Sequence, residues 1–149
     1  HCTVVSYGNL YLQHKDPVLL LTNLIEENNV VYTADLTANF HNCIFWGDNG
    51  TTENEVVTQK RGTTVFLVDF KKCLWKVKDN PENVTSSDIL SNQPPLFDSV
   101  NNQQMFYNFR LKENSPALHF GMVTPLTIDL DGNPRNVGGP DLGAYEKQD

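Results

Sequence analysis

Short runs of aliphatic, β-branched and aromatic residues alternate with polar, turn-forming residues through the first half of the chain. The clearest runs span residues 9–12, 18–23, 30–32 and 65–68. Runs of this length without a sustained 3.6-residue period predict strands. Only residues 84–90 favour a short helical turn, so the pattern predicts an all-β fold.

Three strand-like segments share a cysteine followed by an apolar or β-branched residue and then a larger apolar one. They begin at Cys2, Cys43 and Cys73, so the intervals between them are 41 and 30 residues. Self-similarity at such intervals is typical of a solenoid, in which stacked turns bury a shared core. We expect the longer interval to hold two turns and the shorter one a single turn with a longer loop.

The alignment of these segments predicts which side chains face the core. Because successive strand residues alternate in direction, Phe45 and Trp75 share a face with the cysteines. The three cysteines are too widely spaced for a zinc knuckle and are expected as small buried side chains. Trp46 then points outward, where its ring either stacks on a sugar or lies beneath a covering loop.

The second half of the chain changes character after Lys78, because proline and glycine become frequent. A solenoid needs a non-repeating segment to close its last turn. We therefore expect a single domain over residues 1–149, with solenoid coils in residues 1–78 and an irregular cap in residues 79–149.

Several phrases resemble the end of bacterial right-handed β-helix surface proteins of the choice-of-anchor Q domain type, known from Bacteroidetes-like bacteria. They are residues 42–47, 95–97, 109–112, 115–118, 129–135 and 140–146. The resemblance implies a right-handed parallel β-helix (a pectin-lyase-like solenoid) at the cell surface or outside the cell. It also implies a non-catalytic module that scaffolds, adheres or binds polysaccharide.

One phrase departs from the family pattern, Ser-Pro-Ala-Ile-Asp-x-Gly. Here residues 115–121 carry His119 at the acidic position, so any catalytic or metal role of that acid in relatives would be lost. The chain also starts inside a repeat motif, at His1, which suggests the C-terminal part of a longer β-helix. The alternative function is the C-terminal fragment of a polysaccharide lyase or glycoside hydrolase.

The charge balance bears on partners. There are 18 acidic and 11 basic residues, giving a net charge of −7, and the basic residues do not cluster. This disfavours nucleic acid, whose binding needs grouped lysine and arginine. No apolar run approaches the roughly 20 residues of a transmembrane helix. The open end of a short solenoid favours end-to-end homodimers.

Asp129, Asp131 and Asn133 alternate around Gly132 like the first ligands of a calcium loop. A complete loop would need a distal glutamate, which is absent at the required distance. The alternative is an Asp-Gly turn between two strands. Calcium is the only cofactor that these residues suggest.

Arg135, Asp141 and Glu146 are candidates for a buried ionic cluster that fixes the cap, since a guanidinium suits bidentate carboxylates. Paired carboxylates also serve glycoside hydrolysis, but that needs a cleft which a sequence does not reveal. The serine, cysteine and histidine residues show no nucleophile-elbow context. We assign no catalytic residue.

Overall fold

The computed structural model describes residues 1–9, 11–136 and 139–148, and these residues form strands and irregular segments without a helix. In chain order the strands are β1 (Thr3–Tyr7), β2 (Leu19–Thr22), β3 (Leu24–Glu27), β4 (Val30–Thr33), β5 (Leu36–His41), β6 (Ile44–Asp48), β7 (Val56–Gln59), β8 (Phe66–Trp75), β9 (Thr85–Ser91), β10 (Phe97–Asn101) and β11 (Phe106–Leu111). The all-β prediction is confirmed. The described residues include no helix with the length and hydropathy to span a bilayer.

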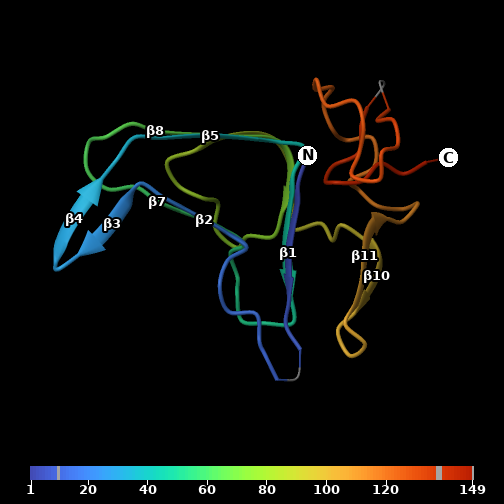
Figure 1. Cartoon of the computed structure of the whole chain (residues 1–149), viewed down its shortest axis with the longest axis horizontal. Helices are drawn as coiled ribbons and strands as arrows, with labels where there is room; N and C mark the ends of the chain where they lie inside the picture. The colour runs from blue at the N-terminus through green and yellow to red at the C-terminus, as the bar shows by residue number, and fades with distance from the viewer. Residues whose placement is uncertain (10, 137–138, 149) are drawn as a thin grey trace.

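The largest sheet is parallel, and its strands come from successive passages of the chain. β1 pairs with β6, the long β8 receives β5 and β6 along one edge, and β9 lies on its other edge. Val4 pairs with Phe45, Phe45 with Trp75, and Cys73 with Ile89, so the passages return after 41, 30 and 16 residues. A second parallel pair, β2 with β7, lies across a common interior from these strands (Figure 1).

The interior is filled by aromatic side chains from equivalent positions of neighbouring strands. Phe40 and Phe70 are register partners whose rings stack with centroids 4.8 Å apart. Phe45 and Trp75 meet Phe70 edge-on at 5.9 and 5.3 Å. Such offset and edge-on arrangements suit the quadrupoles of aromatic rings. The predicted core face of the repeat is therefore confirmed.

The cysteines divide between core and surface. Cys43 and Cys73 are buried in this interior, as expected, and contact with Cys43 together with burial raises the pKa of the Cys73 thiol. Cys2 is exposed, so the prediction of three buried cysteines is wrong for this one. It lies at the start of β1, which pairs with β6 on one side only among the described residues.

The strands of the large sheet share a sharp backbone corner. Asn42, Lys72 and Asp88 have φ values of 56°, 52° and 53°, and the registers align these three positions. Each residue thus turns its strand through the left-handed region, which asparagine and aspartate tolerate better than most residues. In Figure 1 the chain changes direction at this corner, as β5 leads into β6, which lies beside the labelled β1.

The outer face of the large sheet carries a second apolar layer. Ile44, Trp46 and Leu74 point to this face and are buried by residues of the C-terminal segment, including Phe97 and Leu142. The β10–β11 hairpin and the irregular chain after it lie on that side of the sheet (Figure 1). We call the β10–β11 hairpin and the described chain after it (97–136 and 139–148) the C-terminal segment, and it covers the outer face of these strands.

The antiparallel hairpin β3–β4 projects from the opposite side of the molecule (Figure 1). Its base is closed where Ala34 N donates to Asn23 O at 3.0 Å. The Asn23 side chain joins this base to the next passage, because it donates to Arg61 O at 2.9 Å and accepts from Arg61 N at 2.8 Å. Asn23 is buried, which shields its hydrogen bonds to Arg61 from water.

Most predicted strands are confirmed, since the runs at 18–23, 30–32 and 65–68 form β2, β4 and the start of β8. The helical turn predicted at 84–90 is wrong, because that stretch is β9 and pairs with β8. Tyr11 and Leu12 belong to no strand and are exposed, while Leu10 lies outside the described residues. The local sequence pattern is weak at both places, and pairing with other strands in the fold determines whether a strand forms there.

Two predictions about the repeat also need correction. The 41-residue interval does not hold two turns, because β1 pairs directly with β6. The stacked strands do not end at Lys78, because β9 extends the sheet beyond it. The first error arose because loops of very different length separate the strands, which hides the period in the sequence. The second arose because residues 85–91 carry no clear strand pattern.

Candidate functional site

Trp46, the candidate for sugar stacking, points away from the aromatic interior as expected, but the residue is only 7% exposed. It lies in the second apolar layer, and Lys76 Nζ sits 5.6 Å from the ring centroid. The same ammonium donates to Gly47 O at 2.8 Å. Of the two alternatives for Trp46, the structure therefore has the covered ring, because the C-terminal segment lies over this face.

The Asp129 carboxylate organises the loop that suggested calcium. Its Oδ1 accepts the backbone N–H of Asp131 at 2.9 Å and of Asn133 at 2.8 Å, and its Oδ2 accepts that of Glu146 at 2.9 Å. Burial alone would raise the pKa of Asp129, but these hydrogen bonds outweigh it and lower the pKa below the usual value. The carboxylate is therefore ionised and shared among three backbone groups.

The neighbouring residues complete a turn. Gly132 has a φ of 84°, and a β-bridge joins Ile128 to Pro134 across it. Asp131 Oδ2 accepts from Arg110 Nε at 2.9 Å, so its charge is already paired. No group of three or more His, Cys, Asp or Glu in the described ranges is arranged to hold a metal ion. These contacts favour the Asp-Gly turn over the calcium loop.

Arg135 and Glu146 form the buried ion pair that the sequence suggested. Arg135 Nη1 lies 3.3 Å from Glu146 Oε2, with both side chains almost fully buried. Arg135 Nη2 donates to the carbonyls of Gly143 and Ala144 at 3.1 and 3.0 Å. Glu146 in turn accepts the backbone N–H of Asp141 at 2.9 Å. Arg135 Nε is buried without a hydrogen-bond partner among the described residues, so the guanidinium is held through its two terminal nitrogens. A buried pair held in this way fixes the path of the chain.

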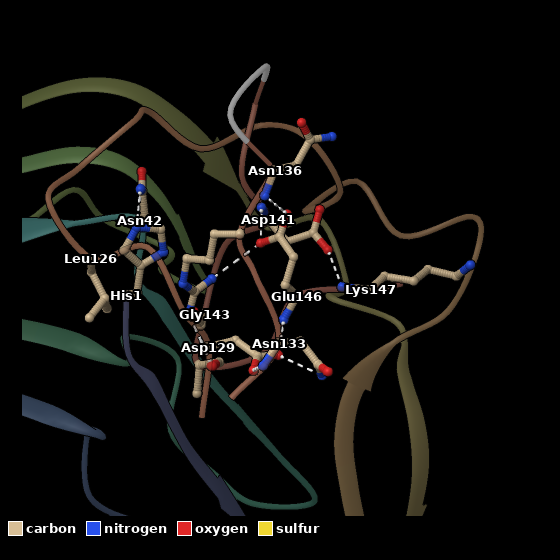
Figure 2. Close-up of polar contacts among 12 residues, drawn as sticks. His1, Asn42, Leu126, Asp129, Asn133, Asn136, Asp141, Gly143, Glu146 and Lys147 are labelled. Carbon is tan, nitrogen blue, oxygen red and sulfur yellow. Dashed lines mark hydrogen bonds and ion pairs between the residues drawn. The ribbon is translucent and has the colours of Figure 1, made fainter. Parts of the chain in front are cut away.

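Asp141 takes part in the cluster through backbone groups, and no ion pair with Arg135 is found among the described residues. It is fully buried, and its carboxylate accepts the N–H of His119 and of Lys147, each at 2.8 Å. Figure 2 shows Asp129, Asp141 and Glu146 within one small volume of irregular chain. We call Asp129, Arg135, Asp141 and Glu146 the cap cluster.

Asn42 anchors the C-terminal segment to the corner of the sheet, a role that the sequence did not indicate. Its fully buried amide donates to Met122 O at 2.7 Å and accepts from Met122 N at 2.9 Å. Gly143 N donates to the Asn42 carbonyl at 2.8 Å. In Figure 2, Asn42 and His1 lie together beside the cap cluster. Its only signal was its place at the start of a resembling motif.

A second buried polar pair, His14 and Glu55, was also missed. His14 Nε2 lies 2.9 Å from both carboxylate oxygens of Glu55, and the two side chains are buried. A Cβ on Gly47 would lie 2.1 Å from Glu55 Oε1, so glycine makes room for the pair. The pair holds the loop after β1 against the loop after β6. No local sequence pattern predicts that two residues 41 positions apart form a pair.

Two surface grooves are large enough for a ligand. One, of about 880 Å³, lies under the β3–β4 hairpin and carries charges of both signs from Glu26, Lys60, Arg61 and Glu82. The other has a volume of about 770 Å³. Its described lining residues are all uncharged, namely Gly8, Asn9, Tyr11, Asn49, Asn102, Gln103 and Met105. We call the second one the amide groove.

Comparisons of this chain with family models, with curated proteins and with solved structures found no match. The functional argument therefore rests on the residues, their geometry and the resemblance described above.

Proposed function

We propose that this chain is the C-terminal end of a right-handed parallel β-helix that acts outside the cell or at its surface as a non-catalytic, polysaccharide-binding scaffold. The observation that carries the proposal is the parallel register of β1, β6, β8 and β9 around one aromatic interior. The last three strands also share the corner at Asn42, Lys72 and Asp88. Successive passages that each add one parallel strand are what a β-helix requires.

The cap cluster supports an architectural role for the C-terminal segment. The phrases that resemble β-helix surface proteins at 129–135 and 140–146 contain all four of its residues. Each of the three carboxylates accepts at least two backbone N–H groups. Groups used in this way build the end of a fold and are poorly placed to act on a substrate.

Charge supports a neutral polysaccharide over an acidic one. The net charge of −7 repels uronates at long range. The amide groove adds a concave, uncharged surface that needs no cation to receive a ligand.

The test is to incubate the protein with neutral and acidic polysaccharides, in calcium and in EDTA, and to measure co-sedimentation, new reducing ends and unsaturated uronate. We expect binding to neutral polymers, in either buffer, without product. Product formation would overturn the non-catalytic assignment in favour of the lyase or hydrolase fragment. Absence of binding to every polymer would overturn the polysaccharide-binding role.

A further inference from the structure

The amide groove is built from three segments that are distant in sequence. They are the loop after β1, the residue after β6 and the tip of the β10–β11 hairpin. Asn102 Nδ2 donates to Gly8 O at 2.8 Å and so ties the hairpin tip to the loop. A Cβ on Gly8 would lie 1.9 Å from Asn49 O, so only glycine allows this approach. In Figure 1 the loop after β1 and the hairpin tip lie at the same end of the molecule.

The walls of the groove offer hydrogen-bonding groups that the protein does not use. The side-chain amides of Asn49 and Gln103 have no hydrogen-bond partner within the described chain. Asn9 differs, because its Oδ1 already accepts the N–H of Tyr11 and Leu12, each at 2.8 Å. A primary amide presents two donors and an acceptor, which matches the paired donor and acceptor character of a hydroxyl group.

An aromatic ring stands beside these amides. Tyr11 is 93% exposed, and its side chain makes no ring contact or hydrogen bond with the described residues. The hairpin that forms the opposite wall is held by stacked rings, with Tyr7 and Phe109 6.3 Å apart and Tyr107 5.9 Å from Phe109. A free aromatic face next to a fixed wall suits a flat ligand with apolar C–H faces.

The lining decides the ligand class. Although the chain has 18 acidic and 11 basic residues, none of those that the structure describes lines the amide groove. Its volume of about 770 Å³ lies within the range of roughly 300–1,000 Å³ usual for ligand sites. The groove offers amides to bind hydroxyl groups, an aromatic ring to contact C–H faces, and no charge. These properties are complementary to an uncharged sugar.

From this geometry we propose that the amide groove binds a neutral oligosaccharide, which stacks on Tyr11 and donates and accepts hydrogen bonds at Asn49 and Gln103. The inference rests on the proposed polysaccharide-binding function and assigns that function to one site. Trp46 has no part in it.

The experiment measures binding of cello-, manno- and chito-oligosaccharides, with oligogalacturonate as the acidic comparison, by calorimetry on the whole chain. Tyr11→Ala should weaken binding of a neutral oligosaccharide at least about tenfold, as truncation of an aromatic anchor does. Tyr11→Phe, which keeps the ring, should bind like the unsubstituted protein. Tyr32→Ala is the matched control, because Tyr32 is 55% exposed and lies outside the groove.

The outcomes separate this inference from the proposed function. Loss of affinity in Tyr11→Ala alone, with an unchanged melting temperature, supports the site. Binding that Tyr11→Ala leaves unchanged, or that is restricted to oligogalacturonate, overturns the site while polysaccharide binding stands. A chain that binds none of the oligosaccharides and no polymer overturns both. A chain that binds polymers but none of these oligosaccharides overturns the site alone.

Discussion

The stacked strands and the C-terminal segment satisfy their backbone hydrogen-bonding groups in different ways. In the large sheet, backbone groups pair with those of the next passage, and the side chains between them are mostly apolar. In the described residues 112–136 and 139–148 no strand forms. Irregular backbone hydrogen bonds remain there, and carboxylates and amides accept many of the other backbone N–H groups. Buried N–H groups need a partner in either case.

This difference separates two sources of stability. The sheet depends on shape and apolar area, which do not titrate. The C-terminal segment also packs apolar side chains on the sheet, but it depends in addition on the charge of a few carboxylates, so it should respond to pH and to single polar substitutions. The following experiments would break or sharpen this contrast.

Phe70→Ala should have the largest effect, because Phe70 is fully buried and contacts the rings of Phe40, Phe45 and Trp75. Removing such a ring leaves a cavity and costs about 4 kcal/mol of unfolding free energy. Urea denaturation measures it. Leu67→Ala, on the same strand with 62% of its side chain exposed, is the control and should change little. Equal effects would contradict the core assignment.

Glu146→Ala should destabilise by about 3 kcal/mol, since it leaves Arg135 buried without its carboxylate. It also removes the acceptor of the N–H groups of Asn136 and Asp141. We expect the loss to concentrate in the C-terminal segment, seen as faster amide hydrogen exchange there than in β8. Uniform acceleration across the chain would show that the two regions unfold as one unit.

Asp129 should make stability depend on acid. Its pKa is lowered in the folded protein by the net effect of its hydrogen bonds. The ionised carboxylate therefore stabilises the fold fully above the unfolded pKa of about 4, and this stabilisation is lost as pH falls through the lower folded value. Denaturation measured between pH 6 and about 2 tests this. Asp129→Asn should be less stable at neutral pH and show a shallower acid loss, and an unchanged pH profile would contradict the argument.

Calcium should have the smallest effect. The Asp129 oxygens accept backbone N–H groups and Asp131 is paired with Arg110, so a cation would have to displace these partners. The melting temperature should be the same in millimolar calcium and in EDTA. A rise with calcium that Asp131→Ala abolishes would restore the calcium loop.

Much of the sheet could be predicted because its signals are local. The alignment of Cys43 with Cys73, and of Phe45 with Trp75, matches the register of β6 and β8. The spacing of the paired strands along the sequence could not be predicted, because strand pairing does not constrain the length of the loop that connects two paired strands. β9 lacked a clear strand pattern, and only its pairing with β8 makes it one.

The cap cluster was partly predictable, and the grooves were not. Arg135 and Glu146 lie close in sequence and have opposite charges, so their pairing followed from residue type. The burial of Trp46 depends on residues such as Leu142 that reach it from the far end of the chain. The amide groove and the His14–Glu55 pair likewise join residues that only the fold brings together.

The β3–β4 hairpin shows where this architecture can change its length. β2 is followed by residues 23–35 before β5, whereas the equivalent connection from β7 to β8 spans only residues 60–65. Asn23 closes the base of the longer connection and joins it to Arg61, so the strands on either side keep their register whatever is spliced between them. The tip of the hairpin is thus a natural insertion point, at which a foreign peptide or a whole epitope could be displayed while the strands beneath it stay in place.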